Sequence, residues 1–128
     1  MNPHAILAPI SLGELIDKIT ILEIKSRHLQ GVALENVHTE LQALNATLED
    51  LDLSVDPLLI AQLQAVNSEL WKIEDAIRDH ERQQQFGDTF IQLARSVYKQ
   101  NDQRAALKKQ INTSYGSSFV EEKSYQAY

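Results

Sequence analysis

The sequence contains no cysteine, so disulfide bonds, thiol nucleophiles and thiolate metal ligands are excluded. It also lacks any run of about 18 apolar residues, the length that a membrane-spanning helix requires. The apolar segment Ala5–Ile10 is short and lacks the basic leader of a signal peptide. We therefore expect a cytoplasmic protein without a membrane span.

Positive charge is also scarce, because 12 Lys and Arg residues stand against 18 Asp and Glu residues, giving a net charge of −6. Nonspecific binding of nucleic acid depends on neutralising phosphates, so this charge argues against a nucleic-acid partner. The distribution is uneven. Residues 34–81 hold eleven acidic residues against Lys72 and Arg78, a net charge of −9, whereas residues 86–112 carry +3. A basic helix packed beside acidic helices explains this pattern, and so does an anion-binding strip on the last helix.

The four glycines and three prolines fall where helices should begin or end. Ser11 followed by Glu14 forms a capping box, and Asp56 before Pro57 is a second helix start. These signals predict helices over residues 12–29, 34–51, 57–85 and 89–112, each boundary being approximate.

Apolar residues of the second and third helices alternate three and four positions apart, as in a coiled-coil seam, and no segment shows the alternation of a strand. The sequence therefore predicts an all-α protein, an antiparallel bundle of about four helices with long helical hairpins. We expect one domain over residues 1–128, with residues 1–10 as an N-terminal extension and residues 113–128 as a C-terminal tail or short arm.

Several polar residues lie on the predicted inward faces when each helix is projected at 100° per residue. Glu23 falls within the apolar face of the first helix, whereas Glu14 caps that helix and Asp17 and Lys18 face solvent. The third helix places Glu74 inside its apolar stripe, and the fourth helix places polar residues where Leu or Val is usual. The candidate ligand-binding residues are Glu23, Glu74, Arg78, Asn101, Arg104 and Lys108.

Buried charges must pair, reach solvent or bind a ligand, so this set has two main interpretations. One is an ion-pair network of Glu23 and Glu74 with Arg78 and Arg104 that fixes the register of the helices. The other is a polar cavity for a small anionic or zwitterionic ligand. The four histidines have no metal-ligand spacing, and no phosphate-binding loop or nucleophile elbow is present. We expect no metal, no cofactor and no recognisable catalytic residue.

Four segments resemble the signature blocks of a small bacterial and phage family described only as a domain of unknown function. They are "ISLGELIDKITILEIKSRHL", "NSELWKIEDAIRDHE", "FIQLARSVYKQNDQRAALKKQIN" and "GSSFVEEKSY". The resemblance covers most of the chain and implies no catalytic residue, although such domains are associated loosely with sugar transfer and cell-surface polysaccharides. The chain is also weakly similar to the all-helical chorismate mutase fold, in which Arg and Lys bind a dianion, but the usual early arginine is missing here.

Two functional hypotheses follow. The first is a non-enzymatic interaction or accessory module, a homodimer that presents its long helices or its Tyr-rich tail to another protein. The alternative is a protein or enzyme that binds a small anionic ligand at the inward polar residues, either similar to chorismate mutase or linked to sugar transfer.

Overall fold

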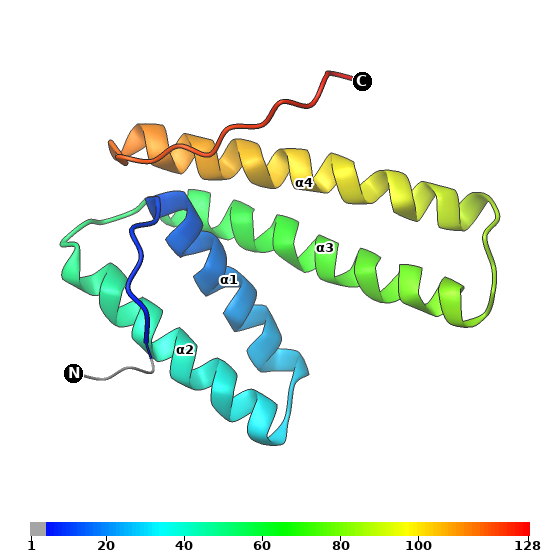
Figure 1. The fold of residues 1–128 in the computed structure, drawn as a ribbon, viewed down its shortest axis with the longest axis horizontal. Coiled ribbons are helices and arrows are strands. Elements are labelled where there is room, and N and C mark those ends of the chain that lie inside the picture. The colour runs from blue at the N-terminus through cyan, green and yellow to red at the C-terminus, as the bar shows by residue number, and fades with distance from the viewer. Residues whose placement is uncertain (1–4) are drawn as a thin grey trace.

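The structure is a computed structural model that describes residues 5–128 (Figure 1). It contains the helices α1 (Leu12–His28), α2 (Gly31–Asp50), α3 (Pro57–Arg82) and α4 (Asp88–Ser114), and no strand among the described residues. The prediction of an all-α protein with four helices is confirmed.

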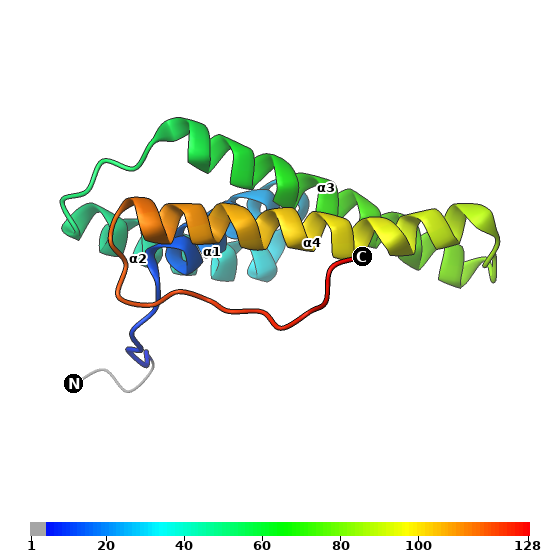
Figure 2. The ribbon, with the colours of Figure 1, turned by 90° about the horizontal axis from the view of Figure 1, so that it is seen from above.

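The helices form two hairpins, α1–α2 and α3–α4, which differ in length and in exposure (Figures 1 and 2). Helix α1 contacts all three other helices, whereas α2 contacts α1 alone. The α3–α4 hairpin extends well beyond the end of α1. After α4 the chain turns back and runs in an extended conformation along that helix.

The predicted caps explain where the helices begin. The Ser11 hydroxyl accepts a hydrogen bond from the Glu14 amide at 3.1 Å, and the Asp56 carboxylate accepts one from the Leu58 amide at 2.9 Å. Helix α2 begins earlier than predicted because Gly31, with φ of +64°, reverses the chain at the α1–α2 turn. Helix α3 ends at Arg82, before the predicted end, and Gln84 beyond it has a positive φ of +55°.

The hydrophobic core lies where α1 crosses the first turns of α3 and the last turns of α4. Its buried residues come from α1, the loop before α3, α3 and α4: Leu12, Ile16, Val55, Leu59, Leu63 and Ile111. Only Val37 of α2 is buried, and the other seam leucines of that helix stay half-buried or exposed. One neighbouring helix is not enough to cover the seam.

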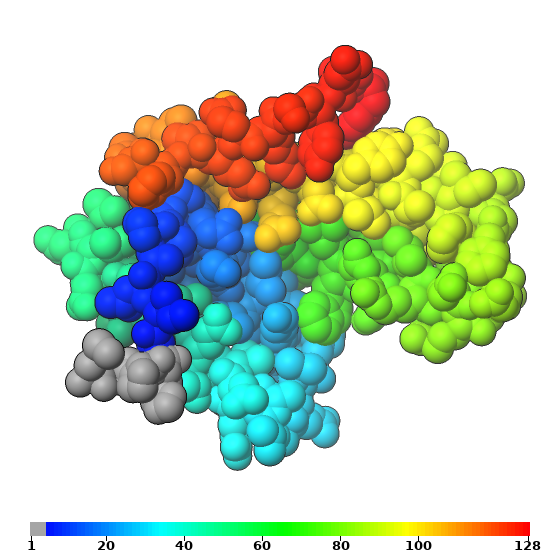
Figure 3. All heavy atoms as spheres, viewed as in Figure 1, coloured from blue at the N-terminus to red at the C-terminus, as the bar shows by residue number. Residues whose placement is uncertain are grey.

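The outer part of the α3–α4 hairpin has no comparable core. No residue from 74 to 107 is buried, although both helices are continuous through this region. Figure 3 shows this part separated from the α1–α2 turn by an indentation of the surface. Within residues 5–128, no helix has an apolar stretch suited to crossing a lipid bilayer.

Candidate functional site

Helix α1 lies close against α4 at Gly13. A Cβ atom at this position would lie 2.5 Å from the carbonyl oxygen of Lys108 and 2.9 Å from Oδ1 of Asn112. The missing side chain lets the Gly13 amide donate a hydrogen bond to Oδ1 of Asn112 at 2.7 Å. The glycine therefore determines the distance between the two helices.

The close approach brings polar side chains of α1 and α4 together in antiparallel order. Asn112, Lys108 and Arg104 are spaced by one helical turn on α4, so they share a face. Opposite them on α1, Gly13 meets Asn112, Glu14 meets Lys108, and Asp17 meets Arg104. We call Glu14, Asp17, Arg104, Lys108 and Glu121 of the C-terminal segment the charge cluster.

Asp17 lies at the centre of the charge cluster and is fully buried. Its Oδ1 accepts hydrogen bonds from Nε of Arg104 and from Nδ2 of Asn67, both at 2.9 Å, and its Oδ2 accepts a further bond from Nη2 of Arg104. Nδ2 of Asn67 also contacts the hydroxyl of Thr20. The hydrogen bond to Asp17 raises the pKa of Arg104 above its usual value, although burial opposes this effect.

Lys108 is buried among three carboxylates. Its Nζ lies 2.6 Å from Glu14, 2.8 Å from Glu121 and 3.9 Å from Asp17. Burial alone would lower the pKa of Lys108, but the hydrogen bonds to Glu121 and Glu14 outweigh it, so the pKa is raised. The same hydrogen bond lowers the pKa of Glu121. The ammonium group is therefore held in its charged form.

The structure corrects the prediction that Asp17 faces solvent. Three helices surround α1, so its buried surface covers far more than one face and includes Asp17 and Thr20. Ser11 caps α1 as predicted by accepting a hydrogen bond from the Glu14 amide. The Glu14 carboxylate contacts Lys108 and Lys18, so its predicted bond to the Ser11 amide, which would complete the capping box, does not form.

Not all of the predicted ligand-binding residues come together. Arg104 and Lys108 point inward and enter the charge cluster, but Glu23 is half-buried and accepts a hydrogen bond from Gln64 instead. Glu74 and Arg78 form their own ion pair at 2.5 Å on α3, with side chains 46% and 65% exposed. Of the predicted network only the Glu74–Arg78 pair forms, and it lies within α3. Arg104 pairs with Asp17 and not with Glu23 or Glu74.

A cleft lies beside the charge cluster, between α1, α3 and α4. Its volume is about 580 Å³, and it contains four of the six predicted residues. Its lining consists of Ile21, Asn67, Leu70, Trp71, Glu74, Asp75, Arg78, Asn101 and Arg104. The cleft thus has a polar wall from α3 and α4 and an apolar wall from Ile21, Leu70 and Trp71.

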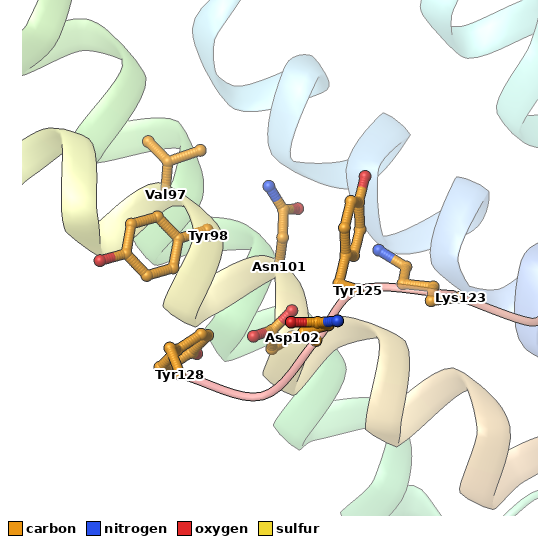
Figure 4. Close-up of a pocket in the computed structure, with 8 residues that line it drawn as sticks. Val97, Tyr98, Asn101, Asp102, Lys123, Tyr125 and Tyr128 are labelled. Atoms are coloured by element: carbon orange, nitrogen blue, oxygen red, sulfur yellow. The ribbon is translucent and has the colours of Figure 1, made fainter.

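A second hollow, of about 530 Å³, lies between α4 and the C-terminal segment (Figure 4). The rings of Tyr98 and Tyr128 meet edge to face at 5.2 Å, and a hydrogen bond to Asp102 raises the pKa of Tyr128. Asn101 lines both this hollow and the cleft. Within residues 5–128 no group of His, Asp and Glu side chains is arranged to hold a metal ion.

Residues 6–128 match the model of a family of unknown function, DUF6165. The chain belongs to this family. None of the curated proteins or solved structures matches the chain, so no match supports the weaker similarity to chorismate mutase. The DUF6165 description assigns no reaction and no site residue, and any function must be argued from the chain itself.

Proposed function

We propose that the protein is a non-catalytic helical interaction module that works as a homodimer through its α3–α4 hairpin. The observation that carries this proposal is the absence of any buried residue from 74 to 107. Most helical stability in proteins comes from packing an apolar face, and two helices alone bury little of it. Two such hairpins packed together would form a four-helix bundle, in which both apolar faces are covered.

The accessible surface supports a partner of substantial size. The chain exposes 8973 Å², whereas a compact monomer of 14.5 kDa exposes about 6,900 Å². The extended terminal segments account for part of this excess. The rest is compatible with a standard interface, which buries about 800 Å² on each partner.

The hairpin carries apolar side chains and complementary charges that suit a second copy. Phe86 and Ile91 are about half exposed, and the rings of Phe86 and Phe90 meet edge to face at 5.2 Å. Exposed Arg95 and Lys99 make α4 basic, whereas α3 is acidic. A two-fold arrangement that sets α4 of one copy against α3 of the other would place opposite charges together.

The charge cluster supports a non-catalytic role. Each of its carboxylates contacts Arg104 or Lys108, and the two cations are stabilised in their charged forms. A general acid or base needs a pKa near the working pH, and these contacts move the pKa of each cation away from neutrality. The cluster therefore suits the positioning of α1 against α4.

Sedimentation equilibrium of the full chain tests the proposal. We expect a mass of twice 14.5 kDa at micromolar concentration. Ile91→Glu places a charge in the proposed interface and should yield a monomer, with the helical circular dichroism retained because Ile91 is 48% exposed in the single chain. Val32→Glu is the matched control, since Val32 is an exposed apolar residue of α2, far from the hairpin.

Two results would overturn the proposal. A wild-type chain that remains monomeric at high concentration would exclude the homodimer. A dimer that survives Ile91→Glu but dissociates in Val32→Glu would place the interface on α2.

A further inference from the structure

Trp71 forms part of the wall of the cleft. Nε1 of Trp71 is buried and has no hydrogen-bond partner among the described residues. Because this atom has no accessible surface, a ligand in the cleft cannot reach it, and Trp71 offers the ligand only its ring. Trp71 lines the cleft, and its ring stacks on His28 with centroids 4.7 Å apart, which fixes the orientation of the indole.

Arg104 supplies a preorganised donor to the cleft. Its Nε and Nη2 are bound to Asp17, and Nη1 takes part in neither bond. The buried carboxylate, itself held by Asn67, locks the guanidinium in place. A positioned guanidinium of this kind suits a planar carboxylate, because it loses little side-chain entropy on binding.

The charges that line the cleft are balanced. Arg78 and Arg104 supply two positive charges, and Glu74 and Asp75 supply two negative charges. Equal numbers of positive and negative side chains disfavour a dianion, which the two acidic side chains would repel. They favour a ligand that carries one positive and one negative charge. The apolar wall of Ile21, Leu70 and Trp71 can accept a nonpolar group.

We infer that this cleft binds a small aminocarboxylate, a molecule of the amino-acid class with one carboxylate, one ammonium group and a nonpolar substituent. The carboxylate lies between Arg78 and Arg104, the ammonium group faces Glu74 and Asp75, and the nonpolar substituent lies against the apolar wall of the cleft. The cleft volume of about 580 Å³ lies within the range of small-molecule sites. All the lining residues belong to one chain.

The only tryptophan in the sequence provides a direct reporter. In a 15N-labelled full-length chain Trp71 gives a single indole N–H signal, which can be followed by nuclear magnetic resonance. The probes are the proteinogenic amino acids, tested one at a time. For each one that binds, its N-acetyl and carboxamide derivatives and inorganic phosphate are tested as well. We expect a saturable shift with at least one free amino acid, and affinity lower by about tenfold or more when either charged group is blocked.

Two variants separate the cleft from general charge effects. Arg78→Gln removes a lining cation that is 65% exposed, so the chain should fold normally and bind about tenfold more weakly. Arg82→Gln is the matched control, because Arg82 lies one turn further along α3 and pairs with Asp79 outside the cleft. It should bind as the wild type does.

The inference is overturned if no amino acid moves the indole signal. It is also overturned if the blocked derivatives bind as tightly as the free molecule, or if phosphate binds more tightly, since the site would then select anions alone. Equal affinities of Arg78→Gln and Arg82→Gln would exclude the cleft as the place of binding.

Discussion

The guanidinium of Arg104 binds the carboxylate of Asp17 at two points, although 87 residues separate them in the sequence. This pair joins the first helix to the last, and Asn67 of α3 contacts the same carboxylate. Three helices therefore meet at one buried charge. Such a carboxylate fixes the relative positions of the helices, because sliding any one of them would leave a buried polar group unpaired.

Replacing Asp17 with Asn should destabilise the protein strongly. The substitution keeps the side-chain shape but leaves Arg104 without its counter-charge. Loss of one partner of a buried pair costs about 3–5 kcal/mol, and we expect about 3 kcal/mol because the Arg104 side chain remains 29% exposed. The free energy of unfolding in urea measures this effect.

Asp79→Asn is the matched control for this prediction. Asp79 also pairs with an arginine, Arg82, but both side chains are at least 60% exposed. An exposed pair contributes at most about 1 kcal/mol, so the control should unfold close to the wild type. Equal losses of unfolding free energy in Asp17→Asn and Asp79→Asn would show that burial does not increase the contribution of the Asp17–Arg104 pair to stability.

Gly13→Ala should destabilise the contact between α1 and α4. The added Cβ would lie 2.5 Å from the Lys108 carbonyl oxygen, a backbone atom that cannot move alone. Overpacking of this kind costs about 1–3 kcal/mol, and thermal unfolding should show it as a lower Tm. Gly87→Ala is the control, because nothing lies within 4 Å of a Cβ at Gly87.

Substitutions of the two cleft arginines should separate a structural residue from a surface one. Arg104→Gln leaves fully buried Asp17 without its cation and should cost about 3 kcal/mol, whereas exposed Arg78→Gln should cost less than about 0.5 kcal/mol. Urea unfolding of the two variants under one set of conditions measures the difference. A large loss in Arg78→Gln would mean that the ion pair with Glu74 supports the fold.

The four helices, and the starting points of α1 and α3, could be predicted from the sequence because the signals are local. The Ser11 and Asp56 caps depend on residues two or three positions away, and both hydrogen bonds form. The inward position of Lys108 followed from the apolar stripe of α4, and the residue is buried. The local apolar pattern was therefore sufficient to predict the burial of Lys108.

The partners of these residues could not be predicted, because they depend on how many helices cover each face. A projection with one inward face assigns Asp17 to solvent, but α1 lies among three helices and buries it. The opposite error concerns Glu74 and Arg78, which the projection assigns to the apolar stripe of α3 but which pair with each other at the surface. Their exposure is a property of the assembled fold and has no local signal.

The contact between Glu121 and Lys108 should make part of the stability depend on pH. Lys108 lowers the pKa of Glu121 below its usual value of 4.5. A carboxylate with a lowered pKa in the folded state contributes stability above its unfolded pKa and loses it as the pH falls through the folded pKa. The wild type should therefore exceed Glu121→Gln in stability at pH 7, and the difference should shrink below about pH 4.

The expected difference at pH 7 is below about 1 kcal/mol, because the Glu121 side chain is 46% exposed and solvent screens the pair. Glu14 and Asp17 also face Lys108, but both remain in the variant, so the comparison isolates Glu121. Urea unfolding of the two proteins between pH 7 and about pH 3 measures the difference at each pH. A gap that widens on acidification would mean that Glu121 is destabilised in its charged form, and that the C-terminal segment is not held on α4 by Lys108.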